Sequence, residues 1–441
     1  MSKNPIIRGT FILTVTGLST RVIGFFFRIF MSHNFGEEQM GLYQLIFPIY
    51  ALCFSFSCAG IETALSRSVA KKMVQGRRKE ADLLLYRSVL VSLILSLLLV
   101  LSTHTFAKPI SQYILHDMRC ELLLKTLMWS LPFASIHSCI CGYYLGRKQT
   151  KVPAISQFIE QLCRVGIVCG LFYFLSNNGK HAPIHLAVIG IVCGEFFAFA
   201  YCFQYFYARK HSAFALTFKR THTTDFQELF HMAIPLTTNR LVINVFQSIE
   251  AISIPIFLQR YGFANVDALS TYGVLTGMAL PCILFPTAIT NSISTMLLPT
   301  VAEIEAANNL NKLKTVIRRV IFFGMLLGSI CNAFFLLFGS FIGQVLFKST
   351  LAGNFLQTLA WICPFLYLNG TLFSILNGLG KATHSFFINV TGLTIRILGV
   401  WYGISHFGMN GYLIGLLISQ LVVTLLCILQ FNSHIAKREL Y

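Results

Sequence analysis

Apolar runs of 20 residues or more recur along this 441-residue chain and are separated by short polar segments. A helix needs about 20 apolar residues to cross the hydrocarbon core of a bilayer. The runs therefore predict an all-α, polytopic membrane protein. About twelve membrane helices are expected, at 9–32, 40–66, 83–104, 122–145, 154–176, 184–207, 229–258, 270–298, 317–345, 355–379, 385–406 and 410–431.

Composition supports the membrane assignment, because 55% of the residues are hydrophobic and only 11% are charged. A soluble domain carries roughly 25% charged residues. The net charge of +18 would suggest a nucleic-acid partner for a soluble protein. In a membrane protein, Lys and Arg instead gather in cytoplasmic loops and near anionic lipids. We therefore expect membrane lipids, and no nucleic acid, as partners.

The basic residues also indicate an orientation. Of the 34 Lys and Arg, 22 fall in segments that are cytoplasmic if the N-terminus is inside, six fall outside and six lie within helices. The positive-inside rule expects this bias, which predicts a cell-membrane protein with both termini in the cytoplasm. The first apolar run carries Arg21 and lacks a signal-peptide cleavage site, so we expect it to remain as the first membrane helix.

The basic segment 209–228 divides the chain into an N-terminal six-helix lobe at 1–208 and a C-terminal six-helix lobe at 229–441. This cytoplasmic linker is either a helix on the membrane surface or a plain connector. Six residues in 61–87 are identical at an offset of 232: Ile61, Thr63, Leu65, Val69, Ala70 and Arg87 match Ile293, Thr295, Leu297, Val301, Ala302 and Arg319. Parallel halves of this kind are related by a pseudo-two-fold axis along the membrane normal, and we expect a central cavity between them.

Charged side chains within the predicted spans are the candidate functional residues, because a charge near the bilayer centre costs several kcal/mol. The candidate substrate-binding residues of the cavity are Arg21, Arg28, Arg240 and Arg396. The candidates for ion coupling or charge balance are Glu62, Glu160, Arg164, Glu195 and Glu250.

Arg21 and Arg28 are about two helical turns apart, so they share one helix face over roughly 10 Å. Two guanidinium groups suit a diphosphate, because each can bind phosphate oxygens with two N–H groups. The alternative is that both pair with buried Glu or extend toward the membrane surface.

Glu160 and Arg164 have the i, i+4 spacing of an intrahelical ion pair. Glu195 has no obvious local partner, so it either carries a coupling proton or neutralises an Arg. We expect His137 to be a hydrogen-bonded core histidine rather than a ligand. The thirteen cysteines include no closely spaced CxxC pair, so neither a metal nor a disulfide framework is predicted, and no cofactor is expected.

Three segments resemble a known family: TRVIGFFFRIFMSHNFG (20–36), GLYQLIFPIYALCFSFSCAGIETALSRSVAKK (41–72) and TYGVLTGMALPCILFPTAITNSISTMLLPTVAE (271–303). They resemble the stage V sporulation protein B branch of the polysaccharide-transport family, within the multidrug/oligosaccharidyl-lipid/polysaccharide exporter superfamily. The resemblance implies two lobes around a cavity and alternating access. It also implies an undecaprenyl-diphosphate-linked saccharide or peptidoglycan precursor as substrate, with H⁺ or Na⁺ as the candidate coupling ion. Arg21 matches an Arg of the related lipid II flippases.

The charged residues also distinguish transport from other possible functions. An enzyme acting on polyprenyl diphosphates would need clustered carboxylates to hold Mg²⁺, whereas the aspartates, Asp82, Asp117, Asp225 and Asp267, are isolated. We therefore expect no enzyme. A cation-coupled multidrug antiporter is the main alternative, but a cationic drug needs a net negative cavity. A non-transporting scaffold would need no charged cavity at all.

Overall fold

In the computed structural model, the backbone is described for residues 5–208 and 223–439, and every regular element in these ranges is a helix. The predicted linker at 209–228 lies mostly outside the described residues. That linker and the lobe boundaries 1–208 and 229–441 therefore remain predictions.

The helices that precede residue 209 are α1 (Pro5–Leu45), α2 (Phe47–Phe54), α3 (Gly60–Val74), α4 (Arg78–Pro109), α5 (Cys120–Met128), α6 (Ser130–Gly146), α7 (Lys151–Asn177) and α8 (His185–Ala208). The later helices are α9 (Thr223–Tyr261), α10 (Asn265–Gly273), α11 (Leu280–Leu284), α12 (Thr287–Ala306), α13 (Leu310–Phe347), α14 (Thr350–Ala360), α15 (Cys363–Gly378), α16 (Ala382–Leu398), α17 (Ser405–Phe407) and α18 (Met409–Glu439). Short π-helical turns interrupt the series at η1 (Ser55–Ala59), η2 (Ile110–Ile114), η3 (Val274–Ala279) and η4 (Gly399–Ile404).

Among the described residues, nine helices are long and apolar enough to cross a membrane, or up to ten if the bent pair of α14 and α15 counts as one span. The all-α membrane fold is thus confirmed, and the number twelve stays a prediction. The continuous stretch 12–74 covers two of the predicted spans. The span predicted at 122–145 is divided between α5 and α6, each too short to qualify alone.

α13 shows why these helices need a lipid environment. Along one side its large apolar side chains are exposed, namely Phe322, Leu326, Ile330, Leu337 and Phe341. Its buried residues include four glycines, Gly324, Gly328, Gly339 and Gly343. An exposed apolar stripe of this length would be unfavourable in water, whereas small residues let membrane helices approach closely. The glycine side of α13 accordingly packs against α14 and α15.

The contacts divide the chain into two compact units, one formed by 1–27 and 45–248 and the other by 28–44 and 249–441. The three boundaries between the units fall in two long helices: those after residues 27 and 44 lie in α1, and the one after residue 248 lies in α9. α1 also contains a break in helical geometry at Gly36, whose φ is +82°, a conformation that glycine adopts with little strain.

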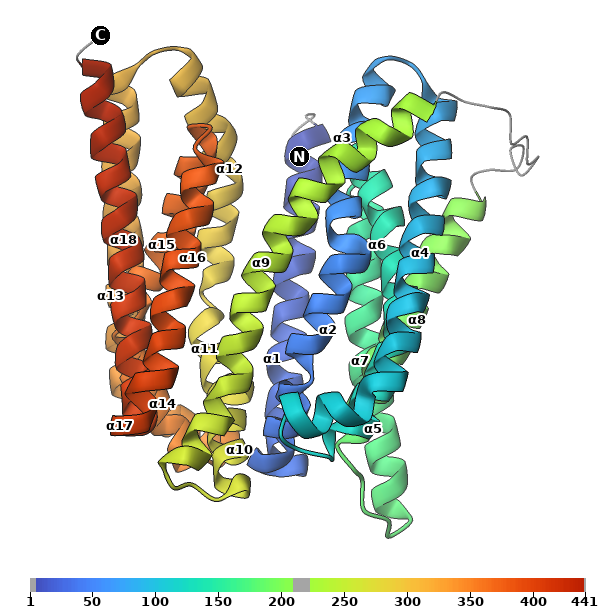
Figure 1. Cartoon of the computed structure of the whole chain (residues 1–441). Helices are drawn as coiled ribbons and strands as arrows, with labels where there is room; N and C mark the ends of the chain where they lie inside the picture. Colours follow the sequence, from blue (N-terminus) through green and yellow to red (C-terminus); the bar gives the residue numbers. More distant parts are fainter. Residues whose placement is uncertain (1–4, 209–222, 440–441) are drawn as a thin grey trace. The chain divides into compact units, whose positions relative to one another are not determined.

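Each unit has its own core and a set of long helices that lie side by side (Figure 1). In the first unit, α6 packs against α3, α4 and α8, and α7 packs against α8. In the second unit, α15 packs against α12, α13 and α18, and α16 packs against α18.

Some pairs of residues 232 positions apart in the chain share the same local backbone conformation in the two units. Three pairs of left-handed residues are separated by this offset: Gly76 and Asn308, His116 and Lys348, and Lys148 and Gly380. Left-handed residues are uncommon outside glycine, so three coincidences at one offset support an internal repeat far better than six identities in biased composition.

The same offset relates a close helix contact. A Cβ atom on Gly146 would lie 2.5 Å from the Ser66 carbonyl oxygen and 2.9 Å from Val69 Cβ. A Cβ atom on Gly378 would lie 2.8 Å from the Leu298 carbonyl oxygen and would also meet Val301. In each unit, a glycine at the same position of the repeat therefore lets two helices come together, α3 with α6 and α12 with α15.

We predict that Gly146→Leu and Gly378→Leu each destabilise the protein by about 1–3 kcal/mol or more, because neither site has room for a side chain. Thermal unfolding in detergent measures the effect. Gly166→Leu is the matched control, since nothing lies within 4 Å of its Cβ position, and it should be neutral or stabilising. Equal melting temperatures for all three variants would contradict the proposed packing.

Candidate functional site

The buried helix α6 organises the polar residues of the first unit. Nearly all its residues are buried, including His137, Ser138 and Cys141. A polar group without water costs free energy unless it is hydrogen-bonded, so the side chains of α6 must find partners on the surrounding helices.

One such partner is Glu62 on α3. The Ser138 hydroxyl donates a hydrogen bond to Glu62 Oε2 at 2.5 Å. Gly142, one turn further along α6, allows this approach, since a Cβ there would lie 2.8 Å from the Glu62 carbonyl oxygen. The side chain of Glu62 is thereby held against α6.

His137 links α6 to two other helices. Its Nδ1 lies 3.3 Å from Glu195 Oε2 on α8, and its Nε2 lies 2.9 Å from the Ser156 hydroxyl on α7. His137 is only 8% exposed. The prediction that His137 is a buried, hydrogen-bonded histidine is therefore confirmed. His137 is also the partner of Glu195, which the sequence did not reveal.

Glu160 on α7 completes this cluster. It forms an ion pair with Arg164 one turn away, which confirms the predicted intrahelical pair. Ligand atoms of His137, Glu160 and Glu195 lie within 4.8 Å of one another. With a neutral imidazole, two carboxylates and one guanidinium carry a net charge of −1. Such a group can take up one proton or one monovalent cation and become neutral.

The second unit contains a different buried ion pair. Glu250 on α9 is 3% exposed, and one of its oxygens, Oε1, accepts hydrogen bonds from Arg396 Nε at 2.7 Å and Tyr412 Oη at 2.8 Å. Three helices, α9, α16 and α18, are joined at this atom. The sequence identified Glu250 and Arg396 as charges within the membrane, and the structure brings them together.

The remaining arginines have distinct surroundings. Arg28 Nη1 donates to the carbonyl oxygens of Thr276 and Gly277 in η3, at 3.4 and 3.2 Å. Arg240 is exposed, and its Nη2 lies 3.4 Å from the Thr63 hydroxyl. Arg21 is also exposed. Arg28 thus has one nitrogen committed to the backbone of a π-helical turn.

Sequence reasoning missed the neutral partners of these charges. Ser138, Ser156 and Tyr412 carry no charge and lie far along the chain from the groups that they contact. Serine and tyrosine are common in membrane helices, so only the three-dimensional contacts distinguish these three residues from others of their type.

Comparison of the two halves of the internal repeat shows that the titratable residues around α6 have no titratable counterparts at three of the corresponding positions in the second unit. At the offset of 232, Glu62 corresponds to Ser294, His137 to Asn369 and Glu160 to Gly392. Asn369 is satisfied by neutral groups, since it donates to Gln420 and accepts from the Thr424 hydroxyl. Because the second unit packs at these positions without titratable groups, the architecture alone does not require them.

Comparison with known proteins identifies the family. The model of the family described as polysaccharide biosynthesis protein matches residues 6–305. The chain belongs to this family. Stage V sporulation protein B of Bacillus subtilis (strain 168) is 27% identical over 434 residues, which cover 97% of this chain and 83% of the relative. Lipid II flippase MurJ of the same organism is 21% identical over 324 residues, which cover 70% of this chain and 59% of the relative.

A solved structure shows the fold of this member of the polysaccharide biosynthesis protein family. The inward-facing conformation of a multidrug resistance MATE family transporter of the MOP superfamily superimposes with a TM-score of 0.76 at 14% identity. The match covers 96% of this chain and 95% of that transporter. The resemblance inferred from the three sequence segments is therefore confirmed.

We predict that Glu250→Gln destabilises the protein strongly, because it leaves the Arg396 guanidinium without its counter-charge in a buried site. Breaking a buried pair costs about 3–5 kcal/mol, and the lower end is expected because the Arg396 side chain is 26% exposed. Thermal unfolding in detergent measures the loss. Glu228→Gln is the control, since the side chains of Glu228 and its partner Lys71 are both exposed. An exposed ion pair stabilises a protein by at most about 1 kcal/mol. A smaller loss for Glu250→Gln than for the control would refute the assignment.

Proposed function

We propose that this protein is a flippase that moves a lipid-linked saccharide, joined to its lipid by a diphosphate, across the cytoplasmic membrane by alternating access. The observation that carries the proposal is membership of the polysaccharide biosynthesis protein family, in which one relative is named as a lipid II flippase. The similarity to a sporulation protein along 97% of the chain supports a role in cell-envelope or spore-cortex synthesis. The protein would act as a transporter rather than as an enzyme.

The arginines supply the chemistry that an anionic head group requires. Arg21 is the residue that we propose as the main contact with the diphosphate, because its side chain is exposed and a planar guanidinium binds phosphate oxygens in pairs. Arg240 is proposed as a second contact on the same grounds. Arg28 is proposed as a further contact, while Arg396 would serve mainly as the counter-charge of Glu250.

The acidic cluster of α6, α7 and α8 is proposed to couple transport to an ion, with H⁺ as the first candidate and Na⁺ as the second. With a neutral imidazole, the net charge of the cluster changes from −1 to zero when one proton binds to Glu160 or Glu195. Loss of that charge changes which hydrogen bonds the His137 imidazole makes to its two neighbours. Glu62, which accepts a hydrogen bond from Ser138 on α6, is proposed as a further coupling carboxylate beside this cluster.

A cation-coupled multidrug antiporter is the second candidate, favoured by the likeness to a multidrug resistance transporter. That likeness concerns the fold, at 14% identity. Positive charge at Arg21 and Arg240 would repel a cationic drug and attract a diphosphate. We further propose that both termini lie in the cytoplasm, an orientation supported by the distribution of basic residues.

We predict that Arg21→Ala abolishes flipping of undecaprenyl-diphosphate saccharides in reconstituted vesicles, because the fixed charge opposite the phosphate is lost. Arg21→Lys should keep part of the activity, since the charge remains but the planar fork does not. Lys180→Ala, at an exposed residue between α7 and α8, is the control and should transport normally. Unchanged flipping by Arg21→Ala would remove the assignment of this residue. Export of cationic dyes by the wild type, without lipid movement, would favour the antiporter.

We predict that Glu195→Gln removes the dependence of transport on an imposed pH gradient, because the amide cannot bind or release a proton. The measurement is the initial flipping rate in vesicles with and without the gradient. Glu121→Gln, which alters a carboxylate paired with Lys125 on α5, is the control and should keep the dependence. If Glu195→Gln responds to the gradient as the wild type does, this residue does not carry the proton. A response to Na⁺ alone in the wild type would replace the proton by Na⁺.

A further inference from the structure

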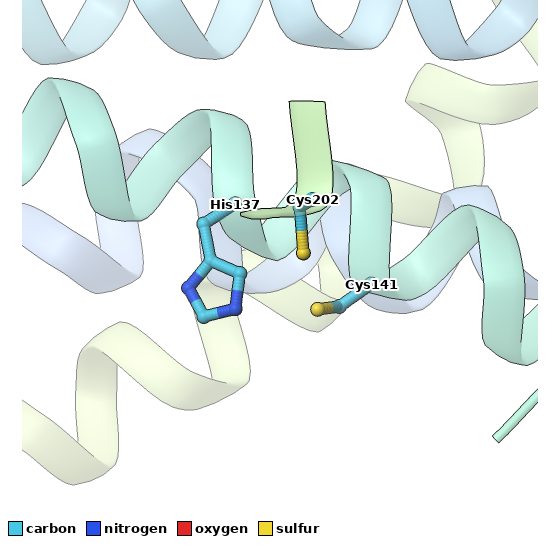
Figure 2. Close-up of side chains that lie close together, drawn as sticks. All are labelled: His137, Cys141 and Cys202. Atoms are coloured by element: carbon cyan, nitrogen blue, oxygen red, sulfur yellow. The ribbon is translucent and has the colours of Figure 1, made fainter. Parts of the chain in front are cut away.

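Three ligand-bearing side chains meet beside the acidic cluster in the first unit. His137 and Cys141 lie one turn apart on α6, and Cys202 lies on α8 (Figure 2). All three are buried, and their nitrogen and sulfur atoms lie within 4.8 Å of one another. Figure 2 shows the imidazole and both sulfur atoms turned toward one common space.

The neighbours of His137 prepare one ring nitrogen for a metal. Nδ1 lies 3.3 Å from Glu195 Oε2, so the tautomer protonated at Nδ1 donates to the carboxylate and keeps the lone pair on Nε2. Histidines that bind metals commonly donate their other nitrogen to a carboxylate in this way. The Ser156 hydroxyl lies 2.9 Å from Nε2 and 3.5 Å from Cys141 Sγ, which places a neutral oxygen at the edge of the same space.

We propose that His137 Nε2, Cys141 Sγ and Cys202 Sγ bind one Zn²⁺ ion, with the fourth position open beside the Ser156 hydroxyl. Two sulfurs and one imidazole nitrogen are ligands that Zn²⁺ prefers. Typical Zn–S and Zn–N distances of about 2.3 and 2.0 Å place ligand atoms less than about 4 Å apart. Ligands already within 4.8 Å would need only small side-chain movements.

Charge favours a divalent ion at this site. Binding releases the two thiol protons, and the two thiolates then cancel the charge of Zn²⁺, which leaves a neutral complex in a buried site. A monovalent copper ion with the same two thiolates would carry −1 next to the Glu195 carboxylate. Burial penalises uncompensated charge, so the neutral zinc complex is the better fit.

The sequence predicted no metal site, because that prediction considered only cysteines that are close together in the chain. Cys202 lies 61 residues after Cys141, a separation that no short metal-binding motif spans. Packing of α6 against α8 is what joins the three ligands. A bound ion would tie these two helices together, independently of what the protein transports.

The proposal is tested on the full-length protein, purified in detergent with a non-thiol reductant and stripped of metal by a chelator. Zn²⁺ is titrated against a competing chromophoric chelator, and Co²⁺ serves as the spectroscopic probe. The expected result is one Zn²⁺ per chain, a rise in melting temperature on binding, and sulfur-to-cobalt charge-transfer absorption.

Variants locate the site. Cys141→Ser and Cys202→Ser should each weaken Zn²⁺ binding at least about 100-fold, and Glu195→Gln should weaken it about 10–100-fold because the acceptor of the histidine's hydrogen bond is no longer a carboxylate. Cys139→Ser is the matched control, because this buried cysteine lies on the same helix but contacts Ser92 instead. It should bind as tightly as the wild type.

Zinc-edge X-ray absorption of the wild type provides a test that requires no variant. Two sulfur neighbours and one imidazole nitrogen at the distances given above would support the site. The proposal is wrong if the zinc shell contains no sulfur, if the wild type binds no Zn²⁺, or if Cys141→Ser and Cys202→Ser bind it as tightly as Cys139→Ser does.

Discussion

The absence of water in the hydrocarbon core is the constraint on which the rest of this structure depends. A buried polar group in that environment must be satisfied by another group of the protein. α6 shows the consequence, because its His137 and Ser138 reach side chains on three surrounding helices, namely Glu62, Glu195 and Ser156. Glu250 shows it again in the second unit, where one carboxylate oxygen accepts from both an arginine and a tyrosine. In both units, the hydrogen bonds that satisfy these groups also hold the helices in register.

Close helix approach makes such contacts possible. Side chains as short as serine reach a neighbouring helix only where the two backbones come near each other, and glycine permits that distance. Gly142 lies against the Glu62 carbonyl, one turn from the serine that binds the same glutamate side chain. Glycine packing and polar satisfaction are therefore parts of one arrangement, and a larger residue at Gly142 would disturb both.

Hydrophobicity and charge sufficed to predict the membrane fold, because both are properties of short stretches of chain. The Glu160–Arg164 pair and the buried state of His137 were predicted for the same reason, since each depends on local spacing or residue type. The pairing of Glu250 with Arg396, 146 residues apart, depends on which helices pack together. So do the meeting of His137 with Glu195 and the approach of Cys202 to Cys141. No local pattern in the sequence shows which of these residues, far apart in the chain, come into contact.

The internal repeat shows which features the two units share and which features occur in the first unit alone. Backbone turns and the contacts of Gly146 and Gly378 are shared by the two units, so they belong to the fold. The carboxylates and the imidazole around α6 are not shared, because Ser294, Asn369 and Gly392 stand at the corresponding positions of the second unit. A buried titratable cluster has a free-energy cost that a stable neutral alternative in the same protein avoids. The presence of this cluster in the first unit fits the proposed coupling role, because uptake and release of an ion require a group that can change its charge.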